Sequence, residues 1–295
     1  MVFADTPRVL TALGGGLARG YLEAMSDKTT SGLAAADRAV LRVGGAGARE
    51  FLQGLVTNDV RRLEVGGAAY AALLSPQGKY LFDFFLVADG PEDALVDVKA
   101  DRAAALAQRL AMYRLRAPVT IAPAGLEVAL GLGPAPEGPR VAADPRDPAL
   151  GWRAYVPDAG AFVRGMVALE PAVLTALRVE RGVPETGVEL IPDDSYILEM
   201  GFERLNGVDF RKGCYVGQEV TARMKHKATL RKGLVRVRVE GPAPPVGAEI
   251  LAGERPAGAL LSVAGDAGLA YLRFDRAEGE LRAGEARITP REGAS

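Results

Sequence analysis

The chain has 295 residues and contains one cysteine and one histidine. The single Cys214 cannot form an internal disulfide, and it cannot by itself supply the thiolates of a structural zinc site or of an ordinary iron–sulfur cluster. The single His226 excludes two-histidine metal sites, so no metal site is predicted. The net charge of −1 gives the whole molecule no bias toward nucleic acid or an anionic membrane, and 48% hydrophobic and 25% charged residues are typical of a globular protein.

Residues 1–24 are predicted to form a flexible N-terminal extension. Gly14, Gly15 and Gly16 interrupt their apolar part, and Asp5 precedes Arg8, so that no basic start is present. This pattern is neither a good signal peptide nor a transmembrane helix. No later window is long and apolar enough to span a membrane.

Proline and glycine runs divide the rest of the chain. Residues 134–148 carry five prolines and are predicted to form a long surface loop, and a second break follows at residues 241–245. The predicted division after the extension is an α+β domain in two parts, 25–133 and 149–230, separated by the loop 134–148 and followed by a β-barrel domain, 231–295.

The elements before this loop mix strands and helices. Alternating or continuous apolar runs predict strands, and apolar residues on one face predict helices. In chain order the predicted elements are a strand at 39–43, a helix at 48–55, strands at 69–74, 80–87 and 94–98, a helix at 101–115 and a strand at 119–121.

Beyond the loop, one helix is predicted first, and only short strands follow it. Pro171 at a first turn and Gly182 just past the end predict a helix from 171 to about 181. Short strands separated by glycine-rich turns then predict a small antiparallel barrel or sandwich, at 234–239, 259–263, 269–274 and 286–289. The fold class is therefore α+β with an all-β C-terminal module.

The most informative stretch is Lys212-Gly213-Cys214-Tyr215-Val216-Gly217-Gln218-Glu219. Its two glycines allow positive φ angles, which predicts a turn or the entry to a helix. Lys212 could lower the pKa of Cys214 and make it nucleophilic. The alternative is a structural cysteine, because free cysteine is among the most buried residue types.

At this stretch the sequence resembles the YgfZ family of folate-binding proteins, whose signature reads K-G-C-Y-x-G-Q-E. That family is related to the glycine-cleavage T-protein, an aminomethyltransferase. The resemblance covers about residues 30–290 and includes Phe51 to Val60, Ser75 to Lys79, Tyr113 to Arg116, Arg178 to Pro184 and Val220 to Arg223. It implies a GcvT-like arrangement of three domains around a central folate opening, with tetrahydrofolate as the ligand.

The resemblance also implies roles for particular residues. Glu180 matches the glutamate that holds the pterin in the T-protein, where a carboxylate accepts two N–H donors at once. Asp83 lies in the stretch that carries two consecutive acids in the T-protein, one of which assists aminomethyl transfer. Here Phe82 occupies one of those positions, which argues against full T-protein chemistry and leaves a folate-contacting or structural role open. Asp83 and Cys214 are the candidate catalytic residues.

Residues 211–238 form a basic stretch with nine lysine and arginine residues and a single acid, Glu219. Such a stretch is suited to an anion such as the glutamyl tail of folate, a phosphate or RNA, or it is simply a solvated surface. Lys212, Gln218 and Arg223 are the predicted folate contacts here, beside Glu180. No aromatic residues are interleaved for base stacking, so direct RNA binding is disfavoured. A nucleophilic pair of Cys214 and His226 is weakly supported, because no third orienting group is evident.

Three functions follow from these observations. The first, implied by the resemblance, is a tetrahydrofolate-binding accessory protein for iron–sulfur cluster assembly or repair, with cluster clients or assembly proteins as partners and an indirect role in tRNA thiolation. The second is a folate-dependent aminomethyl or one-carbon transferase, and the third, retained only as a control, is a Cys/His hydrolase. The expected location is the cytoplasm, or the mitochondrial matrix in a eukaryote.

Overall fold

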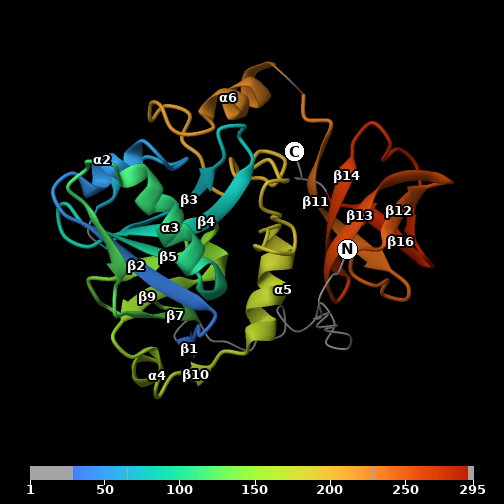
Figure 1. Cartoon of the computed structure of the whole chain (residues 1–295). Helices are drawn as coiled ribbons and strands as arrows, with labels where there is room; N and C mark the ends of the chain where they lie inside the picture. Colours follow the sequence, from blue (N-terminus) through green and yellow to red (C-terminus); the bar gives the residue numbers. More distant parts are fainter. Residues whose placement is uncertain (1–28, 65, 228, 292–295) are drawn as a thin grey trace. The chain divides into compact units, whose positions relative to one another are not determined.

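The computed structural model describes residues 29–64, 66–227 and 229–291, so the predicted extension at 1–24 lies outside the described residues (Figure 1). Contacts within the chain define two compact units. We call residues 29–170 and 190–227 the sheet unit, and residues 171–189 and 229–291 the barrel unit. The units are interleaved along the chain, whereas the sequence analysis assigned domains to consecutive segments.

The sheet unit contains two sheets. The first is an antiparallel sheet in the order β3-β4-β5-β2-β6. Its strands are β2 (Arg38–Gly44), β3 (Ala68–Leu74), β4 (Tyr80–Ala88), β5 (Ala94–Lys99) and β6 (Thr120–Pro123), and they confirm the five predicted strands of this region to within one or two residues. Most apolar residues of β2, β3, β4 and β5 are buried and supply much of the core of this unit, whereas the edge strand β6 is largely exposed.

The second sheet was not predicted from the sequence. It has the order β10-β1-β7-β9-β8, and only the β1–β10 pair is parallel. Its strands are β1 (Ser31–Ala34), β7 (Glu127–Leu132), β8 (Val141–Ala143), β9 (Trp152–Val156) and β10 (Val167–Ala168). Strand β8 lies within the predicted loop 134–148, at the edge of the sheet, in a part of that loop that contains no proline.

Short helices complete the sheet unit. They are α2 (Ala48–Gln53), α3 (Ala103–Arg114), α4 (Ala159–Phe162) and α6 (Gln218–Lys227), with 3-10 turns at Val60–Arg62, Ala100–Arg102 and Pro148–Leu150. Helices α2 and α3 confirm the two helices predicted before the loop. Helix α3 buries Leu106 and Leu110 as its apolar spacing predicts.

The barrel unit consists of helix α5 (Pro171–Arg181) and a closed six-stranded barrel in the order β11-β14-β13-β12-β15-β16. The strands are β11 (Lys232–Glu240), β12 (Glu249–Ala252), β13 (Arg255–Ala264), β14 (Ala267–Arg273), β15 (Leu281–Ala283) and β16 (Ala286–Pro290). In β11 the residues at 235, 237 and 239 are buried valines that alternate with more exposed arginines, the period-2 pattern of a half-buried strand. The predicted barrel is confirmed.

Helix α5 packs on the barrel through apolar and polar contacts. Val179 forms a buried cluster with Ala267 and Leu269 of β14. Arg178 forms an ion pair of 2.9 Å with the buried Glu189, whose carboxylate also accepts a hydrogen bond from the Ser262 hydroxyl. The helix is therefore an integral part of the barrel unit, although about fifty residues separate it from β11.

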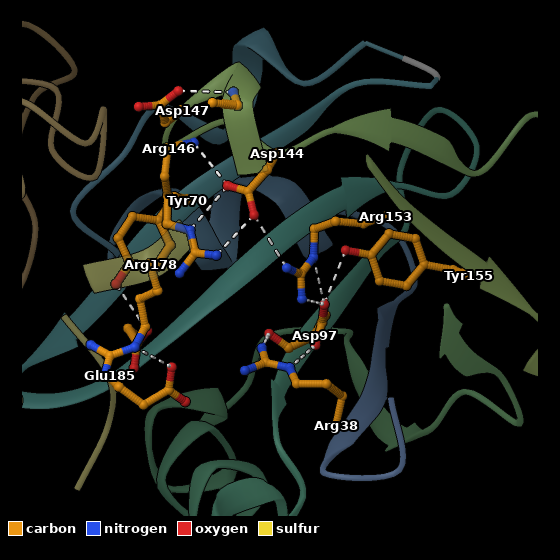
Figure 2. A network of polar contacts seen from close by, with 12 residues as sticks. Arg38, Tyr70, Asp97, Asp144, Arg146, Asp147, Arg153, Tyr155, Arg178 and Glu185 are labelled. Carbon is orange, nitrogen blue, oxygen red and sulfur yellow. Dashed lines mark hydrogen bonds and ion pairs between the residues drawn. The ribbon is translucent and has the colours of Figure 1, made fainter. Parts of the chain in front are cut away.

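A buried ionic network joins the two sheets of the sheet unit (Figure 2). Asp97 of β5, whose side chain is 0% exposed, accepts hydrogen bonds from Arg38 of β2 at 2.7 Å and from Arg153 of β9 at 2.8 Å. Arg153 also contacts the buried Asp144 at 3.3 Å. Burial alone would raise the pKa of Asp97, but the two guanidinium groups outweigh burial and hold that pKa below its ordinary value. The carboxylate is therefore charged and fully paired.

No helix among the described residues is both long enough and apolar enough to cross a membrane.

Candidate functional site

The cysteine of the central motif is exposed. It lies in a turn in which Gly213 has a φ of +98°, just before α6 begins at Gln218. The turn and the helix entry that the two motif glycines predict are therefore present. Exposure gives the Cys214 thiol access to partners, whereas the alternative of a buried structural cysteine required the opposite.

Lys212, two residues before Cys214, is buried and anchors this turn. Its ammonium donates hydrogen bonds to the carbonyl oxygens of Gln53 at 2.5 Å and Val56 at 2.6 Å, at the end of α2. Its own carbonyl oxygen accepts from the Gln53 side chain at 3.2 Å and from Arg61 at 2.9 Å. Burial lowers the pKa of Lys212 to about 8, although nearby acids oppose this shift. These contacts give Lys212 a structural role, and its contact with folate stays a prediction.

The turn after β3, which contains Gly78, and the start of α6, which follows Gly217, contact each other closely. A Cβ atom at Gly217 would lie 2.6 Å from the carbonyl oxygen of Ser75, and one at Gly78 would lie 2.8 Å from Cβ of Val220. Both glycines also have positive φ angles, of +82° and +74°. Because no side chain fits at either position, the turn after β3 and the start of α6 hold each other in place.

Asp83 on β4 lies between two buried tyrosines. Its carboxylate oxygens accept hydrogen bonds from the hydroxyl groups of Tyr70 at 2.9 Å and Tyr80 at 2.8 Å. Burial, and then the charge of Asp83, raise the pKa of Tyr70 well above its ordinary value, so that this hydroxyl remains a donor. Phe82 beside it is buried. Asp83 is thus a half-buried carboxylate in a fixed orientation, and its catalytic role stays a prediction.

Glu180 lies near the end of α5, in the barrel unit. Both of its carboxylate oxygens accept from Arg291 at 2.8 Å, and its side chain is 47% exposed. Glu180 therefore forms an exposed ion pair with Arg291, within the barrel unit. Its contact with a pterin stays a prediction.

The basic stretch is less basic in three dimensions than along the chain. Acids that are distant in sequence pair with its members, so Glu219 is not the only opposing charge. The ion pairs are Arg223 with Glu219, Lys225 with Glu203, and Arg238 with Glu240 and Asp266. Arg223 and Gln218 both lie on α6, and their contacts with folate stay predictions.

His226 does not complete a nucleophilic pair in the described part of the chain. Its ring packs edge-on against Phe210 with centroids 6.4 Å apart, and the structure contains no hydrogen bond between it and Cys214. Among residues 29–64, 66–227 and 229–291, no three His, Cys, Asp or Glu side chains come together as metal ligands.

The sequence analysis missed several residues that shape the site. Gln53 was quoted within a motif but given no role, although its side chain and carbonyl oxygen both contact Lys212. Tyr70 and Tyr80, which orient Asp83, carry no signal beyond their positions in apolar strands. The β3–β4 pairing places Tyr70 on the same face as Asp83, and the register shift opposite Leu73 and Leu74 brings Tyr80 to that face as well.

Comparisons with known proteins agree with this structure. Residues 231–293 match the family model of the CAF17 C-terminal beta-barrel domain. The iron–sulfur cluster assembly factor IBA57, mitochondrial, of Mus musculus is 33% identical over 282 residues, which cover 83% of this chain and 78% of the mouse protein. The Homo sapiens protein of the same name is also 33% identical, with the same coverage.

A solved structure shares the fold at lower identity. The glycine cleavage system aminomethyltransferase T from Bartonella henselae superposes with a TM-score of 0.75 and 17% sequence identity, over 89% of this chain and 85% of that protein. The fold is therefore of the aminomethyltransferase T type, as the resemblance implied. The identity to the mouse and human proteins, with the match of the barrel domain, establishes that the chain belongs to the CAF17/IBA57 family.

Proposed function

We propose that this protein is an iron–sulfur cluster assembly factor that presents Cys214 as one thiolate ligand to a cluster shared with another protein. The observation that carries the proposal is an exposed cysteine on a turn that Lys212 and Gly217 hold in place. The mouse and human relatives are named as cluster assembly factors. Clusters are held by several thiolates, so a chain with one cysteine must share that ligand with a partner or act without ligating the cluster.

The electrostatics of the turn suit a transient ligand. The ammonium of Lys212 is directed to the carbonyl oxygens of α2, so it does not form a permanent ion pair with the thiolate. The exposed thiol can therefore reach iron held by a second protein and release it again. The partners would be cluster assembly proteins or client enzymes, including those that thiolate tRNA, as the YgfZ resemblance implies.

We also propose that tetrahydrofolate binds to the sheet unit at Asp83. The carboxylate of Asp83 is half-buried and is held by hydrogen bonds from two tyrosine hydroxyls. Such a carboxylate can accept further hydrogen bonds from the ring N–H groups of a ligand. Folate, when bound, would supply a one-carbon carrier. Asp83 would accept hydrogen bonds from it, and Tyr70 and Tyr80 would fix the orientation of that carboxylate. Gln218 and Arg223, on helix α6 of the same unit, are further candidate contacts, and the role that the resemblance implies for Glu180 is tested by its own variant.

The cellular location of the protein is proposed from its relatives. The mouse and human relatives are named as mitochondrial proteins. We therefore place this protein in the mitochondrial matrix if its source is eukaryotic, and in the cytoplasm otherwise.

Replacing Cys214 with serine is expected to abolish cluster-related function without affecting folding, because the thiol is exposed and serine is nearly isosteric with it. The variant should fail to restore the activity of cluster-containing enzymes in a strain that lacks the gene, while its melting temperature and its tetrahydrofolate affinity in calorimetry stay unchanged. Full rescue by the variant would overturn the ligand role of Cys214.

Replacing Glu180 with alanine is expected to weaken tetrahydrofolate binding by about 2 kcal/mol, the scale of a lost charge-assisted hydrogen bond. Isothermal titration calorimetry measures this directly. The matched control is Arg291→Ala, which removes the ion pair but keeps the carboxylate, and so should leave binding intact or strengthen it. Equal affinity of Glu180→Ala and the unmodified protein would remove Glu180 from the folate site.

A further inference from the structure

The end of helix α3 presents an unusual surface. Leu115, the residue that ends this helix, has a φ of +43° and a ψ of −105°, and its side chain is 89% exposed. A bulky residue in this backbone region is a genuine outlier, and outliers of this kind cluster at functional sites. A glycine would adopt the same backbone without strain. Leu115 therefore exposes a large apolar side chain to solvent, although its backbone conformation is unfavourable for every residue except glycine.

A second exposed apolar residue precedes it by three positions. Met112 lies in the last turn of helix α3 and is 64% exposed. These are the two most exposed of the large apolar residues in the described chain. A single exposed leucine is common on protein surfaces. Two exposed apolar residues three positions apart, one of them with a strained backbone, call for an explanation.

Three arginines lie close in sequence to the two apolar residues. Arg109, Arg114 and Arg116 form no ion pair with any residue in the described part of the chain, whereas most arginines in the networks above are paired. The negative end of the helix dipole favours a cation such as Arg114 at this position. The dipole does not account for Arg116, which lies beyond the helix, or for the exposed leucine.

We propose that this region, which we call the Leu115 surface (Arg109, Met112, Arg114, Leu115 and Arg116), docks an acidic segment of another protein that carries a large apolar side chain. The arginine fork matches the geometry of a carboxylate, and Leu115 and Met112 supply the apolar contact. The partner is thus defined by carboxylates that flank an apolar residue. This surface is independent of Cys214 and of the folate residues.

Two other occupants fit the Leu115 surface less well. A two-fold contact with a second copy of the chain would place the same arginines opposite one another, which is repulsive. A membrane surface binds through a broad apolar face, and here only two apolar side chains are exposed.

The test uses the full chain as bait for a random peptide library displayed on phage, with parallel selection on the double variant Arg114→Gln/Arg116→Gln. Peptides with acidic residues around a leucine or an aromatic residue should be enriched on the unmodified protein only. The best peptide, labelled with a fluorophore, is then titrated in anisotropy measurements. Leu115→Gly and the double arginine variant should each weaken its binding about tenfold or more, the effect of losing a hot-spot contact.

The variants separate binding from folding. Leu115→Gly relieves the backbone strain, so its melting temperature should stay the same or rise while binding is lost. Val246→Ser and Arg164→Gln remove an exposed apolar and an exposed basic residue elsewhere, and should bind the peptide normally. No enrichment, enrichment of neutral or basic peptides, or unchanged binding by Leu115→Gly would overturn the proposal. So would Leu115-dependent flotation with phosphatidylcholine–phosphatidylserine vesicles, or a Leu115-dependent dimer in sedimentation.

Discussion

Replacing Asp97 with asparagine is expected to lower the free energy of unfolding of the sheet unit by about 3–5 kcal/mol, the cost of breaking a buried ion pair from one side. Asp97 is fully buried and accepts hydrogen bonds from Arg38 and Arg153, so its neutralisation leaves the buried guanidinium of Arg153 and the partly buried one of Arg38 without their shared carboxylate. Urea denaturation followed by tryptophan fluorescence measures this loss. The chain has one tryptophan, Trp152, which is buried next to Arg153 and reports on this unit directly.

The control for this change is Glu219→Gln, which removes the same charge from an exposed ion pair with Arg223. Exposed pairs of this kind contribute little, so the unfolding midpoint of that variant should match the unmodified protein. If Asp97→Asn unfolds at the same urea concentration as the control, the buried network does not stabilise the sheet unit.

The same network gives a pH dependence with a definite sign. The pKa of Asp97 is lower in the folded chain than its ordinary value of about 3.9, so the folded state binds fewer protons than the unfolded state. Its stabilising contribution is therefore complete above that ordinary value and is lost as the pH falls through the folded pKa. The stability difference between the unmodified protein and Asp97→Asn should shrink below about pH 4.

Replacing Lys212 with methionine is expected to lower the free energy of unfolding by about 2–3 kcal/mol, because the carbonyl oxygens of Gln53 and Val56 lose their hydrogen-bond donor inside the protein. The variant keeps Cys214 but releases the turn that carries it. It should therefore also fail to restore cluster-enzyme activity in a strain that lacks the gene. Urea denaturation and the rescue assay give the two readings.

Lys225→Met is the matched control for Lys212. Lys225 belongs to the same basic stretch but is exposed and pairs with Glu203 at the surface. Its replacement should leave both stability and rescue unchanged. A Lys212→Met protein that is as stable and as active as this control would show that the buried ammonium does not hold the turn.

The sequence predicted the first sheet and the barrel because their strands bury apolar residues in regular patterns. It did not predict β9, since Arg153 interrupts the apolar run Trp152 to Val156. The charge of Arg153 is tolerated there only because Asp97 and Asp144 meet it, and Asp97 lies 56 residues away in the chain. Polar helix α6 was anticipated only as the entry to a helix, because its sequence has no strong apolar face.

At the site, the sequence identified the motif but left the environment of Cys214 open and gave no sign that Lys212 is buried. A cation beside a thiol suggested that Lys212 might activate Cys214, and a lone cysteine suggested burial as the alternative. In the structure Lys212 is the buried residue and Cys214 the exposed one. The partners of the Lys212 ammonium, the carbonyl oxygens of Gln53 and Val56, have no side-chain signature and could not be read from the sequence.

The interleaving of the two units has a consequence for synthesis on the ribosome. Helix α5 emerges with its apolar residues Val173, Leu177 and Val179, but the strands that cover it, β13 and β14, follow only after another 74 residues or more have been translated. During that interval a nascent chain exposes the apolar face of α5, and exposed apolar surface of this kind favours misassembly. A chain that stalls between residues 227 and 255 would therefore be a natural substrate for chaperones and proteases, even though the sequence of its sheet unit is already complete.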